Sequence, residues 1–195
     1  MDDTSRRMDA RDIFIKGKRV LLKVLTEDDV LNSNWYGWFN DEDTTRFTQQ
    51  HRYPNTKEEQ LEYYKKYIRG SKDKVQLGVC DINGDKLLGV ISLSNIDMVS
   101  RKAEIGIMMG EKEGRNVKCF IEAMNLMLRH AFMSLNLERV YAGTISHEYA
   151  NLLCRACGFT MEGMLRGDVF KDGVYHNTYL VGQLKSEFLE LKIHT

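Results

Sequence analysis

The chain has 195 residues, enough for one domain with a substantial hydrophobic core and short for two. Apolar residues make up 43% and charged residues 29%, the balance of a globular protein and not of a disordered one. The 28 basic and 28 acidic residues cancel, so no overall field draws the chain to nucleic acid or to an anionic membrane. Any anionic ligand must therefore be bound by a local site.

No apolar run is long enough to span a bilayer, and the polar start of the chain lacks the apolar segment of a secretory signal. The cysteines are few, unevenly spaced and set among apolar residues, which indicates reduced thiols. We therefore expect a cytoplasmic protein with one domain at residues 17–188, between a flexible tail at 1–16 and a short tail at 189–195.

The residue pattern in the first third of the chain predicts a strand and two helices. Residues 20–25 form an apolar run typical of a strand. Thr26 follows as a helix N-cap, with three acidic residues in the first turn, and this helix is expected to run towards Phe39. Either Asn55 or Thr56 caps a second helix.

The rest of the chain alternates strands with two helices. The Asn83–Gly84 pair marks a tight turn between two strands. The expected elements, in chain order, are strands at 75–81, 86–95 and 104–109, a charged loop at 110–118 with a long helix after it, a strand at 139–145, a helix at 148–157, and a hairpin of strands at 160–170 and 174–184.

This order predicts an α/β fold in which helices cover a mixed sheet. The strand–helix–strand unit between residues 104 and 145 should cross over right-handedly and make its two strands parallel. Where such a pair splays, the crevice beside a helix N-terminus is a common place for a ligand.

Several segments, in this order and spacing, resemble the Gcn5-related N-acetyltransferases (GNAT superfamily), closest to the branch that acetylates ribosomal-protein N-termini and amino sugars. Glu104–Glu113 resembles the fourth strand of that family. The other matching segments, which together extend over roughly residues 18–188, are Trp38–Asp41, Glu122–Ala123, Ala131–Phe132, Leu137–Val140, Gly158–Phe159, Glu162–Arg166 and Phe170–Tyr175. The resemblance implies a mostly antiparallel central sheet that splays at one parallel strand pair, with helices on both faces.

The resemblance also implies that acetyl-CoA is the cosubstrate and that no metal takes part. In the family, backbone N–H groups at a bulge in the fourth strand bind the thioester carbonyl, and a loop before the long helix holds the CoA pyrophosphate. The corresponding residues here are Met108, Met109, Arg115, Asn116, Val117, Lys118, Cys119, Phe120 and Asn151.

Two positions of the phosphate loop depart from the family pattern, because Lys118 and Phe120 stand where glycines let the backbone approach the phosphates. The Phe120 ring then either fills the space of the pyrophosphate or pantetheine, or turns into the core while Lys118 contacts phosphate by charge. A third reading is a loop that only caps a core helix.

Three residues are candidates for proton transfer. Glu104 begins the strand beside the expected cleft, so it is either the general base or an exposed strand-end charge. His147 stands where the family has asparagine, and either binds substrate, relays a proton or is simply polar at a helix start. Cys154 replaces the family tyrosine that protonates the leaving thiolate. Its partner in the C-x-x-C sequence, Cys157, has no second pair with which to make a zinc site.

The acceptor pocket is expected among aromatic and basic residues near the first helix. Large rings with a polar handle suit sugars, and an arginine in the following loop suits a phosphorylated or carboxylated acceptor. These substrate-binding candidates are Trp35, Trp38, Phe39 and Arg52.

The favoured hypothesis is an N-acetyltransferase that moves an acetyl group from acetyl-CoA to a small primary amine, such as an amino sugar or nucleotide-linked amino sugar. Open alternatives are a protein N-terminus or an aminoglycoside as acceptor, another acyl-CoA or carrier as donor, and a non-catalytic binding or interaction protein. Neither nucleic acid nor a membrane is an expected partner, and a homodimer through edge strands is left open.

Overall fold

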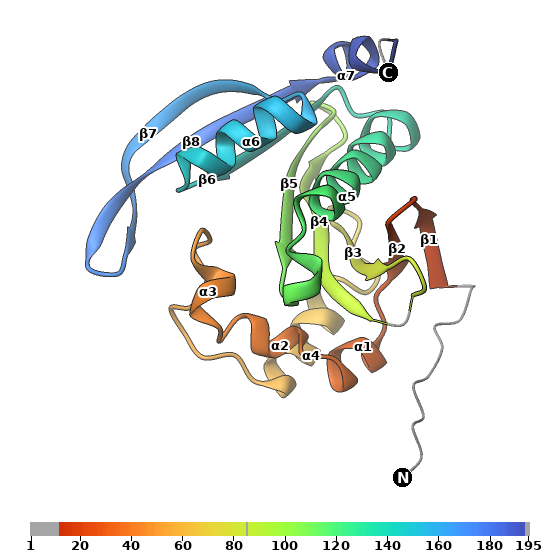
Figure 1. The fold of residues 1–195 in the computed structure, drawn as a ribbon, viewed down its shortest axis with the longest axis vertical. Helices are drawn as coiled ribbons and strands as arrows, with labels where there is room; N and C mark the ends of the chain where they lie inside the picture. The colour runs from red at the N-terminus through yellow and green to blue at the C-terminus, as the bar shows by residue number, and fades with distance from the viewer. Residues whose placement is uncertain (1–11, 85, 194–195) are drawn as a thin grey trace.

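The computed structural model describes residues 12–84 and 86–193, and an eight-stranded sheet in the order β1-β2-β3-β4-β5-β6-β8-β7 organises them (Figure 1). All neighbouring strands pair antiparallel except β5 and β6, which are parallel. The strands are β1 (Ile13–Lys16), β2 (Val20–Val24), β3 (Val75–Asp81), β4 (Leu87–Asp97), β5 (Lys102–Met109), β6 (Arg139–Thr144), β7 (Thr160–Lys171) and β8 (Val174–Leu184). The expected fold class is confirmed.

Helices cover both faces of this sheet and enclose two cores. The helices are α1 (Glu27–Asn32), α2 (Trp35–Trp38), α3 (Glu42–Thr45), α4 (Lys57–Tyr67), α5 (Val117–Arg129), α6 (His147–Cys157) and α7 (Lys185–Ile193). Along β4, Ile91 and Leu93 belong to the main core under α5 and α6, whereas Val90 belongs to a smaller core with α1, α2 and α4. Alternate residues of a strand point to opposite faces, so the two cores lie on opposite sides of the sheet. No helix in the described part of the chain is both long and apolar enough to cross a bilayer.

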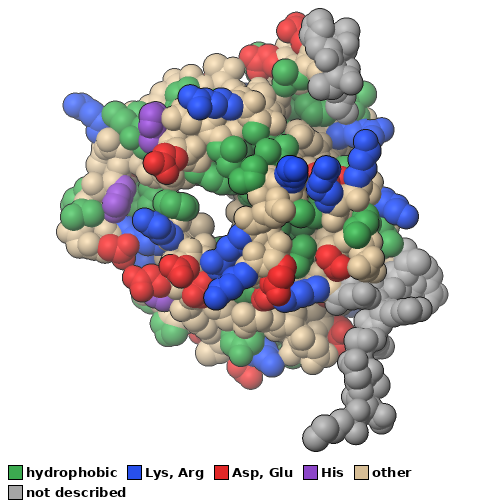
Figure 2. All heavy atoms as spheres, viewed as in Figure 1, with side chains coloured by type: hydrophobic (Ala, Val, Ile, Leu, Met, Phe, Trp, Pro, Cys, Tyr) green, Lys and Arg blue, Asp and Glu red, His purple; other side chains and the backbone are tan. Residues whose placement is uncertain are grey.

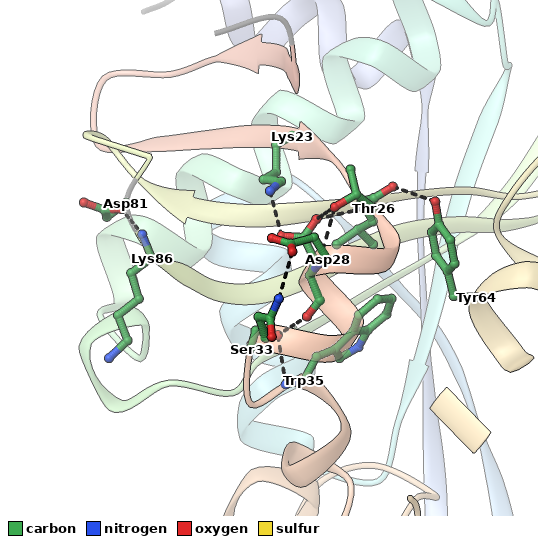
Figure 3. Close-up of polar contacts among 11 residues, drawn as sticks. Lys23, Thr26, Asp28, Ser33, Trp35, Tyr64, Asp81 and Lys86 are labelled. Carbon is green, nitrogen blue, oxygen red and sulfur yellow. Dashed lines mark hydrogen bonds and ion pairs between the residues drawn. The ribbon is translucent and has the colours of Figure 1, made fainter. Parts of the chain in front are cut away.

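A polar network fixes the first helix to the end of β2 (Figure 3). The Thr26 hydroxyl accepts a hydrogen bond from the Asp29 backbone N–H, and the Asp29 carboxylate accepts one from the Thr26 N–H at 2.8 Å, which completes a capping box. The same carboxylate pairs with Lys23 Nζ at 2.6 Å, and both side chains are only 11% exposed. The Tyr64 hydroxyl donates to the Leu25 carbonyl, which ties α4 to the same corner.

The structure differs from the sequence expectations at the first helix and near both ends of the domain. The helix expected to reach Phe39 ends at Asn32, because Ser33 is extended and its N–H and hydroxyl both donate to the Asp29 carbonyl. Strand β1 and helix α7 were not predicted, and α7 continues to Ile193, beyond the expected domain end at residue 188. Of the expected N-terminal tail, residues 1–11 lie outside the described residues.

Replacing Asp29 with alanine is expected to lower the free energy of unfolding by about 2–4 kcal/mol. The change removes the helix cap and leaves the Lys23 ammonium nearly buried without its partner. Adding Lys23→Met should recover at least about 1 kcal/mol of that loss, since the unpaired charge is then gone. Urea unfolding of the two variants measures both values, and a double variant no more stable than the single one would contradict a desolvated ion pair.

Candidate active site

Strands β5 and β6 stay paired at only three positions. The paired residues are Lys102, Ala103 and Glu104 on β5 with Arg139, Val140 and Tyr141 on β6. Beyond them β5 follows β4 as far as Met109, and β6 follows β8 as far as Thr144. The two strands therefore diverge, and the space-filling view shows an opening through the molecule beside β5 (Figure 2). We call this opening the β5–β6 gap.

The backbone of β5 presents unpaired donors to this gap. The Gly110 N–H donates a hydrogen bond to the carbonyl of Leu88, the residue of β4 that faces it, at 3.0 Å. In an antiparallel pair, every second residue of a strand forms its backbone hydrogen bonds with the same neighbouring strand. Met108, two residues before Gly110, therefore also directs its N–H group to β4, whereas Ile107 and Met109 direct theirs away from β4. That side is the gap, because β6 no longer pairs there.

The bulge expected at Met108–Met109 lies further along the chain. Gly110 and Glu111 both donate to the Leu88 carbonyl, at 3.0 Å each, which is the pattern of a β-bulge. The register between β4 and β5 is regular through Met108 and Met109. The expectation was wrong in position, because the extra residue enters only where the strand turns into the following loop.

Trp38 explains why a glycine stands at this bulge. A Cβ atom on Gly110 would lie 1.9 Å from Trp38 Cδ2, so only glycine lets the indole pack on the backbone. The indole Nε1 donates to Glu111 Oε1 at 2.9 Å. Trp35 and Trp38 are 0% and 1% exposed, so they are core residues and do not wall an acceptor pocket as expected. Phe39 is half-buried against the same core.

The loop before α5 combines a helix N-terminus with two basic residues. Asn116 caps α5 by accepting the Lys118 N–H at 2.9 Å, and the exposed Val117 opens the helix. The first-turn N–H groups of Val117 and of the half-buried Cys119 have no acceptor within the helix. The Lys118 ammonium makes no ion pair with any residue in the described part of the chain.

Arg115, expected to bind CoA, is engaged elsewhere. Its Nη2 donates to Thr44 Oγ1 at 2.6 Å, to the Gly110 carbonyl at 3.2 Å and to Asp41 Oδ2 at 3.3 Å. Hydrogen bonds from Thr44, with the nearby Arg115 charge, hold the pKa of Asp41 below its ordinary value. Arg115 therefore joins the phosphate loop to α3. This contact could not be predicted from the local sequence, because the partners are far apart along the chain.

Phe120 turns into the core. It is 8% exposed, and its ring meets that of Tyr149 edge-on, with centroids 5.4 Å apart. This placement agrees with the second of the alternatives for the loop, in which Phe120 packs inward and Lys118 is left at the surface. Burial raises the pKa of the Tyr149 phenol, so that group stays protonated at neutral pH.

Glu104 lies where the gap begins. Its neighbours Ala103 and Ile105 point into the main core, so its side chain points to the opposite face, the one that carries α4. There Asn95 Nδ2 donates to Glu104 Oε2 at 3.0 Å. Asn95 has a left-handed backbone, with φ of 52°, which asparagine tolerates better than most residues. Sequence reasoning missed Asn95 because its partner is nine residues away on another strand.

His147, Asn151 and Cys154 share one flank of α6, because they are spaced four and three residues apart. The His147 ring packs 4.9 Å from the Tyr179 ring, and Asn151 Nδ2 is 3.4 Å from His147 Nε2. Burial raises the pKa of the half-buried Cys154 thiol, so the thiol is protonated at neutral pH. Within the described residues, no three His, Cys, Asp or Glu side chains form a group that would hold a metal ion.

The tip of the β7–β8 hairpin reaches back to the segment around α3. Lys171 Nζ donates to the carbonyls of Thr45 and Thr48, at 2.8 and 3.0 Å. Arg52, expected to bind the acceptor, instead donates to the Phe170 carbonyl at 3.2 Å. With the Arg115 contact, these bonds make α3 a bridge between the phosphate loop and the hairpin.

Comparison with known proteins agrees with this arrangement. The sequence profile of the acetyltransferase (GNAT) domain matches residues 19–160. The proposed ribosomal N-acetyltransferase YdaF of Bacillus subtilis is 33% identical over 104 residues, which cover 52% of this chain and 56% of that protein. A spermidine N(1)-acetyltransferase of Vibrio cholerae is 28% identical over 130 residues, 66% of this chain and 73% of that protein. The match to YdaF thus spans little more than half of that relative's length.

Solved structures share the fold. A spermidine N-acetyltransferase from Vibrio cholerae, solved with CoA and spermine, superposes with a TM-score of 0.78 at 24% identity. The match covers 87% of this chain and 98% of that one. At this identity the likeness concerns the fold alone, and the roles of the residues named above stay predictions.

Replacing Phe120 with alanine is expected to cost about 3–4 kcal/mol of folding free energy, because the ring fills the core beside Tyr149. It should not tighten the binding of acetyl-CoA. Val117→Ala, an exposed change in the same helical turn, is the control and should stay within about 0.5 kcal/mol. Chemical unfolding with and without acetyl-CoA decides the matter, and a Phe120→Ala protein that binds acetyl-CoA more tightly would mean that the ring obstructs the site.

Proposed function

This chain belongs to the GNAT acetyltransferase family, and on that premise we propose that it transfers an acetyl group from acetyl-CoA to a small primary amine. The observation that carries the proposal is the β5–β6 gap. One edge of it offers backbone N–H groups that β6 does not pair, and a carboxylate stands where it begins. A helix N-terminus lies beside the end of β5, and its Lys118 pairs with no carboxylate among the described residues.

The phosphate end of CoA is assigned to the start of α5. The helix dipole and the free first-turn N–H groups favour a diphosphate there. Lys118 adds a positive charge that no described carboxylate neutralises. With Phe120 turned inward, the residues present fit a diphosphate, although they contact it by charge in place of the close backbone approach that glycines allow.

The transfer needs a proton taken from the amine and a proton given to the thiolate. In our assignment Glu104 removes a proton from the ammonium group of the acceptor, directly or through water. The neutral amine attacks the thioester carbonyl, and the N–H groups of Ile107 and Met109 stabilise the oxygen as it gains charge. As the C–N bond forms and the C–S bond breaks, the protonated thiol of Cys154 gives its proton to the departing thiolate, and the proton that the attacking nitrogen loses as the amide forms returns through water to the Cys154 sulfur.

The acceptor that we propose is an amino sugar. The relatives reported above are named for ribosomal and spermidine acetylation, so the shared chemistry is acetylation of an amine and not one substrate. A non-catalytic role has less support. It would be favoured by a Phe120 ring that fills the cofactor site, and that ring is instead turned into the core.

Replacing Lys118 with alanine is expected to weaken acetyl-CoA binding about tenfold, the effect of one exposed charge-assisted contact to phosphate. S-acetylpantetheine lacks the diphosphate and should bind the variant and the parent protein equally. Calorimetry with both thioesters measures the difference. Equal loss for both donors would indicate a general structural defect, and no loss for either would place the diphosphate elsewhere.

Glu104→Gln and Cys154→Ala are each expected to lower kcat about a hundredfold, because each removes one proton-transfer group. Glu58→Gln, a change of an exposed carboxylate on α4, should leave kcat within about twofold. Steady-state release of CoA thiol reports the rates. An unchanged kcat in either of the first two variants would remove that residue from the mechanism.

A further inference from the structure

A cavity of about 270 Å³ lies at the C-terminal end of α4, separate from the phosphate loop. The lining comes from α4, from the segment just before β3 and from the end of β4, and includes Tyr63, Lys66, Tyr67, Asp73, Lys74 and Asn95. The two phenol rings are 5.5 Å apart between centroids. The cavity thus combines two aromatic rings, tilted by 43° to each other, with two ammonium groups.

Neither lysine of this cavity forms an ion pair with a described residue, although the Glu62 carboxylate, one helical turn before Lys66, adds a favourable charge near it. Lys66 Nζ lies 4.9 Å from the centre of the Tyr67 ring. Lys74 Nζ lies 4.9 Å from the centre of the Tyr63 ring and donates to the Tyr63 hydroxyl. Neither ammonium is within ion-pair distance of a carboxylate in the described part of the chain. Asp73, the acidic residue of the lining, accepts a hydrogen bond from the Ser71 hydroxyl at 2.8 Å.

The cavity adjoins the proposed general base. Ser94 is the direct partner of Glu104 in the β4–β5 register. Asn95, the next residue of the lining, donates to the Glu104 carboxylate at 3.0 Å. A molecule seated against the lysines would therefore lie on the face of the sheet to which Glu104 points, beside that carboxylate.

We propose that this cavity binds an anionic group of the acceptor, a phosphate or a carboxylate, while the amine of the same molecule lies at Glu104. This inference rests on the proposed function and narrows it to amines that carry negative charge. Phosphate and carboxylate oxygens accept hydrogen bonds from ammonium groups, and a sugar ring packs well on tyrosine faces. A polyamine carries no anion, and its ammonium groups would meet Lys66 and Lys74 with repulsion.

The test compares matched amines that differ in charge. Glucosamine, glucosamine 6-phosphate, glucosaminic acid and spermidine are measured as acceptors with the parent protein and with a Lys66→Ala, Lys74→Ala double variant. Lys65→Ala is the control, since Lys65 lies on the same helix but pairs with Glu27 outside the cavity. Binding of the same amines to the CoA complex is measured by calorimetry, which does not depend on turnover.

The parent protein is expected to prefer at least one anionic amine over glucosamine by about tenfold in kcat/KM and in affinity, and to disfavour spermidine. The double variant should lose the preference, Lys65→Ala should keep it, and added salt should weaken it. Acetylation of all amines alike, unaffected by the lysines, would overturn this inference and leave the proposed function standing. No acetylation of any amine, together with equal binding of charged and uncharged ones, would overturn both.

Discussion

The end of hydrogen bonding between β5 and β6, after Glu104 and Tyr141, is the constraint on which the rest of the structure depends. Backbone N–H and C=O groups that lose a partner inside a protein must find another, or the fold loses free energy with each one. A regular sheet would avoid this loss by pairing both strands to their ends. Here the unpaired stretch of β5 is kept at the edge of an opening, where a bound molecule with amide and carbonyl groups can supply the missing partners.

Contacts on both sides of the gap keep the strands apart. On one side, β4 pairs with β5 to its end, and the Trp38 indole locks the bulge at Gly110. On the other side, β8 pairs with β6 along its whole length. The segment around α3 spans the distance between them through Arg115 and Lys171. Contacts from both sides of the gap therefore hold β5 and β6 apart.

Features that depend on local sequence were predictable. The cap at Thr26, a second cap at either Asn55 or Thr56, and the strand 75–81 follow from short patterns, and the structure agrees with them, with Thr56 as the second cap. Features that depend on distant partners were not. Trp35 and Trp38 looked suited to a pocket wall until the fold placed α2 against β5. Arg115 matched a phosphate-binding position, yet its partners Asp41 and Thr44 come from a segment some seventy residues earlier. Asn95 carried no signal at all.

A crystal structure of the protein with acetyl-CoA would test the central claim most directly. We expect the thioester arm to lie in the β5–β6 gap, within hydrogen-bond distance of the Met109 or Ile107 N–H, with the diphosphate at the start of α5 beside Lys118. A cofactor bound outside the gap, or a diphosphate away from the α5 N-terminus, would contradict the assignment of the gap as the place of acetyl transfer.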